Sequence, residues 1–123
     1  MIKSVLPQII SVHQQEDTIT WHIFVDASLD FFKGHFPEQA VLPGVTQLDW
    51  AVQLGCKAFG YDPKVASLEV LKFQQLLLPN SQVELTINHN KDKARLTFQY
   101  ANGDKRYASG RIMFTPNVSG NNS

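Results

Sequence analysis

The sequence predicts an α+β fold in which one long helix packs against a curled antiparallel sheet of about six strands. Strand-like segments with alternating apolar residues occur at residues 5–13, 18–26, 65–79, 82–90, 93–101 and 105–115. A single helical pattern lies at 43–60, between the second and third of these segments. Two strands, a helix and a meander of four strands favour a sheet that curls around its helix.

The first two segments predict a hairpin that turns at residues 14–17. In the second of them, Ile19, Trp21 and Ile23 alternate with polar or aromatic residues, which is the two-residue period of a strand. Residues 27–42 have no clean period, and we expect a loop or a short helix there.

The helix is predicted from its ends and from its periodicity. Pro43 suits the first helical position, and Gly60 suits the position where a helix stops. Apolar residues at three- and four-residue spacing predict the buried stripe, which comprises Val45, Leu48, Val52, Gly55 and Phe59.

Turn sequences at residues 79–81, 90–93 and 102–105 separate the last four strands. Several large apolar side chains of these segments are expected in the core: Phe73, Leu76, Leu78, Phe98 and Met113. One helix cannot cover so long a sheet, so a leftover edge or face favours pairing with a second copy.

Composition limits the function classes. The chain has 123 residues, 43% hydrophobic and 18% charged, with a formal net charge of zero, and neither nucleic-acid nor membrane binding is expected. We expect one domain at 1–116 and a disordered tail at 117–123. Cys56, the one cysteine, excludes an internal disulfide and a cysteine-rich zinc site. With no apolar run long enough to span a bilayer, a cytoplasmic protein without a metal or cofactor is expected.

The start of the helix is the first candidate site. Gly44 and Val45 follow Pro43, and their backbone amides have no acceptor within the helix. Together with the helix dipole, such amides suit an oxygen that gains negative charge during a reaction. The alternative is a plain helix that begins with proline.

His35 is the second candidate, in a loop eight residues before Pro43. Its neighbours Phe31, Phe32 and Phe36 are apolar, which favours the neutral imidazole that a general base requires. The alternative is an ordinary surface or hydrogen-bonded histidine.

Asp49 is the third candidate, in the second helical turn beside the apolar stripe. Partial desolvation of a carboxyl at this place favours its protonated form, which can act as a general acid. The alternative is a solvated aspartate at the edge of the helix.

Together, a neutral base, a protonated acid and an oxyanion-binding helix end suit one reaction. His35 would remove a proton next to a carbonyl, the helix amides would hold the carbonyl oxygen, and Asp49 would protonate the departing hydroxyl. That reaction is the dehydration of a 3-hydroxyacyl thioester.

The segment that carries these residues reads FKGHFPEQAVLPGVTQLDWAVQ, residues 32–53. It resembles the active-site motif of the FabZ/FabA-like 3-hydroxyacyl-[acyl-carrier-protein] dehydratases, and His35, Gly44, Asp49 and Gln53 match its order and spacing. The resemblance implies a hot-dog fold and a homodimer with an acyl tunnel at its interface. It also implies an active site that takes His35 and Asp49 from opposite subunits, and an acyl carrier protein as partner.

The residues expected against the substrate are Phe36, Gly44, Val45, Trp50 and Gln53. The chain departs from the larger subgroup in having aspartate rather than glutamate at position 49, and Trp50 rather than a small residue. An aspartate in a short chain resembles the small ApeI-type dehydratases of aryl polyene clusters. A hetero-oligomer with related subunits is consistent with that type.

Two other functions stay open at this point. A hot-dog thioesterase would hydrolyse the acyl thioester, but it has no need of His35. A non-catalytic acyl-binding or scaffold subunit would tolerate replacement of both His35 and Asp49.

Overall fold

The computed structural model describes residues 6–26 and 42–115. His35, Phe36 and the predicted tail at 117–123 lie outside the described residues. The elements in chain order are β1 (Gln8–Gln15), β2 (Thr18–Phe24), α1 (Gly44–Phe59), β3 (Val65–Phe73), β4 (Gln82–Asn90), β5 (Arg95–Asn102) and β6 (Lys105–Phe114).

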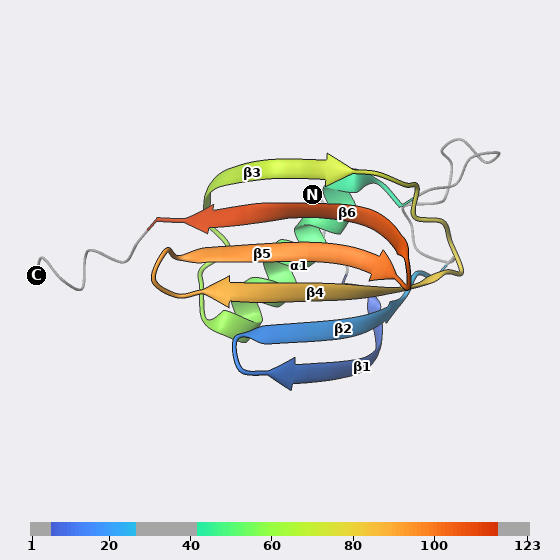
Figure 1. The fold of residues 1–123 in the computed structure, drawn as a ribbon, viewed down its shortest axis with the longest axis horizontal. Coiled ribbons are helices and arrows are strands. Elements are labelled where there is room, and N and C mark those ends of the chain that lie inside the picture. Colours follow the sequence, from blue (N-terminus) through green and yellow to red (C-terminus); the bar gives the residue numbers. More distant parts are fainter. Residues whose placement is uncertain (1–5, 27–41, 116–123) are drawn as a thin grey trace, which may run out of the picture.

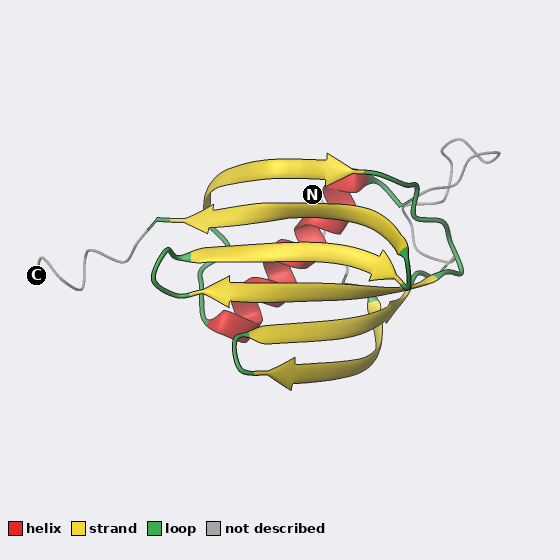
Figure 2. Ribbon diagram, in the orientation of Figure 1, coloured by secondary structure: helices red, strands yellow, loops and turns green. Residues whose placement is uncertain are grey.

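The strands form one six-stranded sheet in the order β1-β2-β4-β5-β6-β3, and all neighbours are antiparallel. The helix α1 lies against one face of the sheet and crosses the strands diagonally (Figure 1). Figure 2 shows the same two layers, one of strands and one of helix. The expected helix and curled antiparallel sheet of a hot-dog fold are therefore confirmed.

The core lies between α1 and the four central strands. Inward-facing residues alternate with more exposed ones along β2, β4 and β5, as the two-residue period predicts. The buried side chains of the sheet include Ile19, Trp21, Ile23, Val83, Leu85, Ile87, Leu96, Phe98, Tyr100 and Ile112.

The helix buries a different stripe from the one predicted. Val45 is 74% exposed, whereas Gln47, Trp50 and Leu54 are buried. Leu48, Val52 and Phe59 pack only partly against the core. The prediction counted apolar residues and so passed over Gln47, which is buried because its amide is hydrogen-bonded, Nε2 donating to the Leu42 carbonyl at 3.1 Å.

Both helix ends were predicted closely. Pro43 is the N-cap rather than the first helical residue, since the helix begins at Gly44. At the other end Gly60 adopts the left-handed conformation, with a φ of 80°, and its N–H donates to the Cys56 carbonyl at 2.8 Å.

The edge strand β3 corrects another prediction. Phe73, Leu76 and Leu78 were expected in the core but are 50%, 69% and 50% exposed in the protomer, while Phe98 is buried as expected. β3 ends at Phe73, so Leu76 and Leu78 lie in the connection to β4 rather than in a strand. The sequence alone does not show that β3 lies at the edge of the sheet, where its large apolar side chains are only partly covered.

Candidate functional site

The first backbone N–H groups of α1 have no carbonyl acceptor within the helix. Both Thr46 N–H and Gln47 N–H donate to the Pro43 carbonyl, at 3.0 and 3.1 Å, whereas Gly44 and Val45 occupy the first two helical positions. Val45, the second helical residue, is largely exposed. These two amides are the groups that the sequence predicts to bind a negatively charged oxygen.

Gly44 lies close to the end of β3. A Cβ built on Gly44 would stand 3.0 Å from Cε1 of the Phe73 ring, so a larger residue would press against that ring. The helix therefore begins beside the end of β3, as Figure 1 also shows.

Asp49 is half-buried in the second turn of α1. Gln53, one turn further on, donates its side-chain N–H to Asp49 Oδ1 at 3.5 Å. The structure thus brings together Asp49 and Gln53 on the helix whose first residues are Gly44 and Val45.

The remaining predicted site residues have different surroundings. The Trp50 side chain is fully buried in the core, so its contact with substrate stays a prediction. His35 and Phe36 lie outside the described residues, and their roles stay predictions as well.

Two residues near Asp49, Gln47 and Tyr100, were not identified from the sequence. Tyr100, on β5, is fully buried and its hydroxyl donates to the backbone carbonyl of Gln47 at 2.6 Å. Burial raises the pKa of Tyr100 well above its usual value, and the charge of Asp49 adds to this rise. The available signal was a tyrosine in the inward series of a strand, because a buried phenol needs a hydrogen-bond partner.

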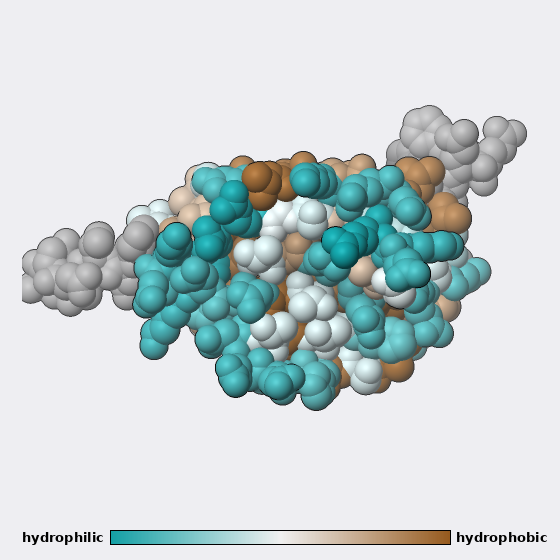
Figure 3. Space-filling model, viewed as in Figure 1, coloured by the Kyte–Doolittle hydropathy of each residue, from teal (hydrophilic) through white to brown (hydrophobic). Residues whose placement is uncertain are grey.

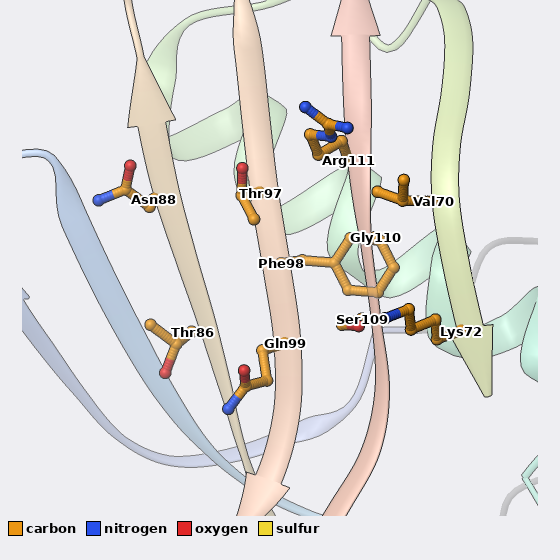
Figure 4. A pocket seen from close by; sticks show the side chains of 10 residues that line it. All are labelled: Val70, Lys72, Thr86, Asn88, Thr97, Phe98, Gln99, Ser109, Gly110 and Arg111. Carbon is orange, nitrogen blue, oxygen red and sulfur yellow. The ribbon is translucent and has the colours of Figure 1, made fainter. Parts of the chain in front are cut away.

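A hollow lies on the face of the sheet opposite to the one that α1 covers. It is a depression of about 600 Å³ lined mainly by polar side chains of β4, β5 and β6, including Thr86, Asn88, Thr97, Gln99 and Ser109 (Figure 4). Gly44, Val45, Asp49 and Gln53 do not line it. Its polar lining agrees with the pale and hydrophilic centre of this face in Figure 3, where brown hydrophobic groups gather along β3.

The described residues offer neither a metal site nor a membrane-spanning helix. No three or more His, Cys, Asp or Glu side chains of residues 6–26 and 42–115 are grouped so that they could hold a metal ion. Over the same ranges no helix combines the length and the apolar character that a membrane crossing needs.

The fold and the sequence resemble known dehydratases. Residues 11–111 match the ApeI-like family, described as ApeI dehydratase. A 3-hydroxyacyl-[acyl-carrier-protein] dehydratase FabZ of Clostridium perfringens is 31% identical in an alignment of 94 residues, with 68% of each chain covered.

Two solved structures are similar over nearly their whole length. An uncharacterised protein from Erwinia carotovora subsp. atroseptica has a TM-score of 0.78 and 32% identity, with 93% of this chain and 99% of that chain covered. The dehydratase heterocomplex ApeI:P from Xenorhabdus doucetiae has a TM-score of 0.76 and 34% identity, with 89% and 97% covered. The chain belongs to the ApeI-like family of hot-dog dehydratases.

Proposed function

We propose that this protein removes water from a 3-hydroxyacyl thioester carried on an acyl carrier protein and releases the trans-2-enoyl thioester. The observation that carries this proposal is the position of Asp49. It is a half-buried carboxyl one turn beyond the helix N-terminus, and Gln53 holds one of its oxygens. The relative from Clostridium perfringens, named for this reaction, supports the choice of substrate class.

Each group in the proposed reaction moves one proton or stabilises one charge. His35 takes the proton from C2, and the electrons of that C–H bond form the C2–C3 double bond. The bond from C3 to its hydroxyl breaks as Asp49 donates a proton, so water leaves. The amides of Gly44 and Val45 stabilise the thioester oxygen while it carries extra negative charge.

After one turnover His35 holds the proton from C2 and Asp49 has lost its own. Transfer of one proton from His35 to Asp49, directly or through water, restores both groups. The reaction consumes no oxidant or reductant, and it needs no cofactor in this scheme.

The active unit in this proposal is a homodimer with His35 from one subunit and Asp49 from the other. The edge strand β3 supports such pairing, because it is exposed along nearly all its length. Its large apolar residues Leu68, Val70, Leu71 and Phe73 are 39–54% exposed in the protomer. Side chains of this kind gain stability when a partner covers them.

The wider setting is proposed from the family and its relatives. The reaction would serve fatty acid or aryl polyene biosynthesis in the cytoplasm. The ApeI:P heterocomplex of Xenorhabdus doucetiae also supports assembly with a related subunit.

Turnover of a 3-hydroxyacyl carrier protein, followed by mass spectrometry, tests the function. We expect loss of one water from the acyl chain with the thioester intact. Release of the free 3-hydroxy acid would show a thioesterase instead. Binding of the acyl carrier without any change in mass, both for the protein alone and with a co-expressed related subunit, would show a non-catalytic acyl-binding protein.

A further inference from the structure

A buried tyrosine holds the first turns of α1 against the sheet. Tyr100 comes from the middle of the sheet and is fully buried, and its hydroxyl donates to the Gln47 carbonyl at 2.6 Å. This short bond joins β5 to the helix two residues before Asp49.

The side chain of Gln47 extends the connection in the other direction. Gln47 Nε2 donates to the Leu42 carbonyl at 3.1 Å, and Leu42 N–H donates to the Leu77 carbonyl at 2.7 Å. Tyr100, Gln47, Leu42 and Leu77 therefore form a chain of hydrogen bonds. It links β5, the helix, the segment that enters the helix and the connection after β3.

Simple core packing does not account for these two polar residues. Gln47 is only 3% exposed, and its Oε1 atom has no hydrogen-bond partner among residues 6–26 and 42–115. A buried acceptor left in this way costs roughly 1–3 kcal/mol, which an apolar side chain of the same volume would avoid. Phenylalanine at position 100 would likewise fill the core without a hydroxyl. The glutamine and the tyrosine thus do more than fill the core, because their hydrogen bonds tie the start of α1 to residue 42 and to the sheet.

Both residues contact the start of α1, which is the part of the helix that the proposed reaction uses. Between them they fix the backbone from residue 42 to residue 47, and Gly44, Val45 and Asp49 lie on or directly after that stretch. Because burial keeps the Tyr100 phenol protonated, its hydroxyl can donate at any pH at which the protein works.

We propose that Tyr100 and Gln47 are positioning residues, which lock the start of α1 so that the Gly44 and Val45 amides and the Asp49 carboxyl face the substrate in a fixed arrangement. This role rests on the proposed dehydration. Small displacements of such groups are costly, since an error of about 1 Å can lower a rate by roughly 100-fold.

The test compares Tyr100→Phe with Tyr61→Phe as a matched control. The Tyr61 hydroxyl is hydrogen-bonded to His89 Nε2 at 2.8 Å, just beyond the other end of the helix. Each variant loses one phenol hydroxyl and one hydrogen bond, so similar losses of stability are expected, about 1 kcal/mol. We expect kcat to fall about 10-fold or more in Tyr100→Phe, with KM within about threefold, and to stay near wild type in Tyr61→Phe.

Gln47→Met provides a second variant of similar volume. It removes both the donor to Leu42 and the unpaired acceptor, so its melting temperature should stay close to wild type while kcat falls. Equal kcat values for Tyr100→Phe, Gln47→Met and wild type would overturn the positioning role. So would a loss of activity in Tyr61→Phe as large as that in Tyr100→Phe.

Amide hydrogen exchange separates this inference from the proposed function. Tyr100→Phe should speed exchange at Leu48 and Asp49 by about tenfold relative to Tyr61→Phe. If wild type does not dehydrate the substrate, the proposed function fails, and this exchange measurement still decides whether Tyr100 fixes the helix start. Unchanged exchange at both amides would show that it does not.

Discussion

At the residue scale, the proposed dehydration requires the carboxyl of Asp49 as its general acid. Asp49→Asn keeps the size and polarity of the side chain but has no proton to give to a departing hydroxyl. We expect it to lose about 100-fold or more in dehydration rate, because a positioned general acid contributes about 10²–10⁴-fold. Asp49→Glu keeps the acid and should retain partial activity. Equal turnover by the two variants, measured by mass spectrometry, would make Asp49 a structural residue.

The stability that Cys56 contributes is predicted to change with pH only in the alkaline range. Burial, and then the charge of Asp62, raise the pKa of this thiol from 9.0 to about 11 in the folded protein. The folded state therefore holds the thiol proton more tightly than the unfolded state. The resulting stability is fully present below pH 9 and is lost as pH rises towards 11.

Urea unfolding of wild type and Cys56→Ala between pH 8 and pH 11 measures this contribution. The difference in free energy of unfolding between the two proteins should shrink over that range, on the order of 2 kcal/mol in total. Tyr100 also has a raised pKa, but it is present in both proteins and cancels in the difference. The pKa of Tyr61 is raised by burial and then by the charge of Cys56, so both proteins in the comparison should also carry Tyr61→Phe. A constant difference across the range would contradict the shift.

The positions of the candidate site residues in the fold were predictable where they follow from the order of residues along the chain. Gly44, Val45 and Asp49 could be placed because a helix start and its second turn can be located from Pro43 and the apolar spacing. Gln47 and Tyr100 could not, because their role depends on a contact between residues 53 positions apart. Nothing local in the sequence shows which carbonyl a buried phenol will meet.

At the element scale, Gly55 sets how closely α1 approaches the sheet. A Cβ at this position would stand 2.7 Å from Leu96 Cδ1 and 3.2 Å from Ile87 Cδ1, both in the core. Helix propensity alone would make Gly55→Ala stabilising by about 1 kcal/mol. We expect the opposite sign, a loss of about 1–2 kcal/mol, because overpacking a close contact costs about 1–3 kcal/mol.

Gly60→Ala is the control for backbone effects without crowding. No atom lies within 4 Å of a Cβ built there, but the φ of 80° disfavours any residue with a side chain. It should lose about 1 kcal/mol with the helix–sheet packing unchanged. Thermal unfolding gives both stabilities, and a more stable Gly55→Ala would show that Leu96 and Ile87 yield freely.

The elements themselves were predicted better than their surroundings. β4 and the helix end at Gly60 follow directly from turn residues and periodicity. The exposure of Phe73, Leu76 and Leu78 does not, because it depends on the order of strands in the sheet. That order places β3 beside β6 at an edge, although β4 and β5 separate the two in sequence.

At the scale of the whole molecule, the shared site can be tested with mixed dimers. His35→Ala and Asp49→Asn should each be inactive as homodimers. After the two are refolded together, about half of the dimers should be mixed, and one of the two sites in each mixed dimer pairs intact His35 with intact Asp49. About a quarter of the wild-type activity should therefore return.

If both residues came from one chain, every site would keep one lesion. An inactive mixture in which mass spectrometry shows mixed dimers would therefore refute the shared site. The dehydration chemistry of the individual residues would be unaffected by that result.

The outermost strands of the sheet, β1 and β3, each have an irregularity in their pairing with the neighbouring strand. This irregularity affects how a further chain could add to the sheet. A sheet with an unpaired strand at each edge can pair with further chains on both sides, and repeated pairing of this kind builds a fibre. In β3, the pairing register shifts between Glu69 and Lys72, where Val70 has a φ of 46°, and in β1 it shifts between Ile9 and Ser11. Such bulges twist and shorten the straight stretch that a further chain could copy. We therefore expect these irregularities to limit the addition of further chains, even though apolar side chains of both edge strands are exposed.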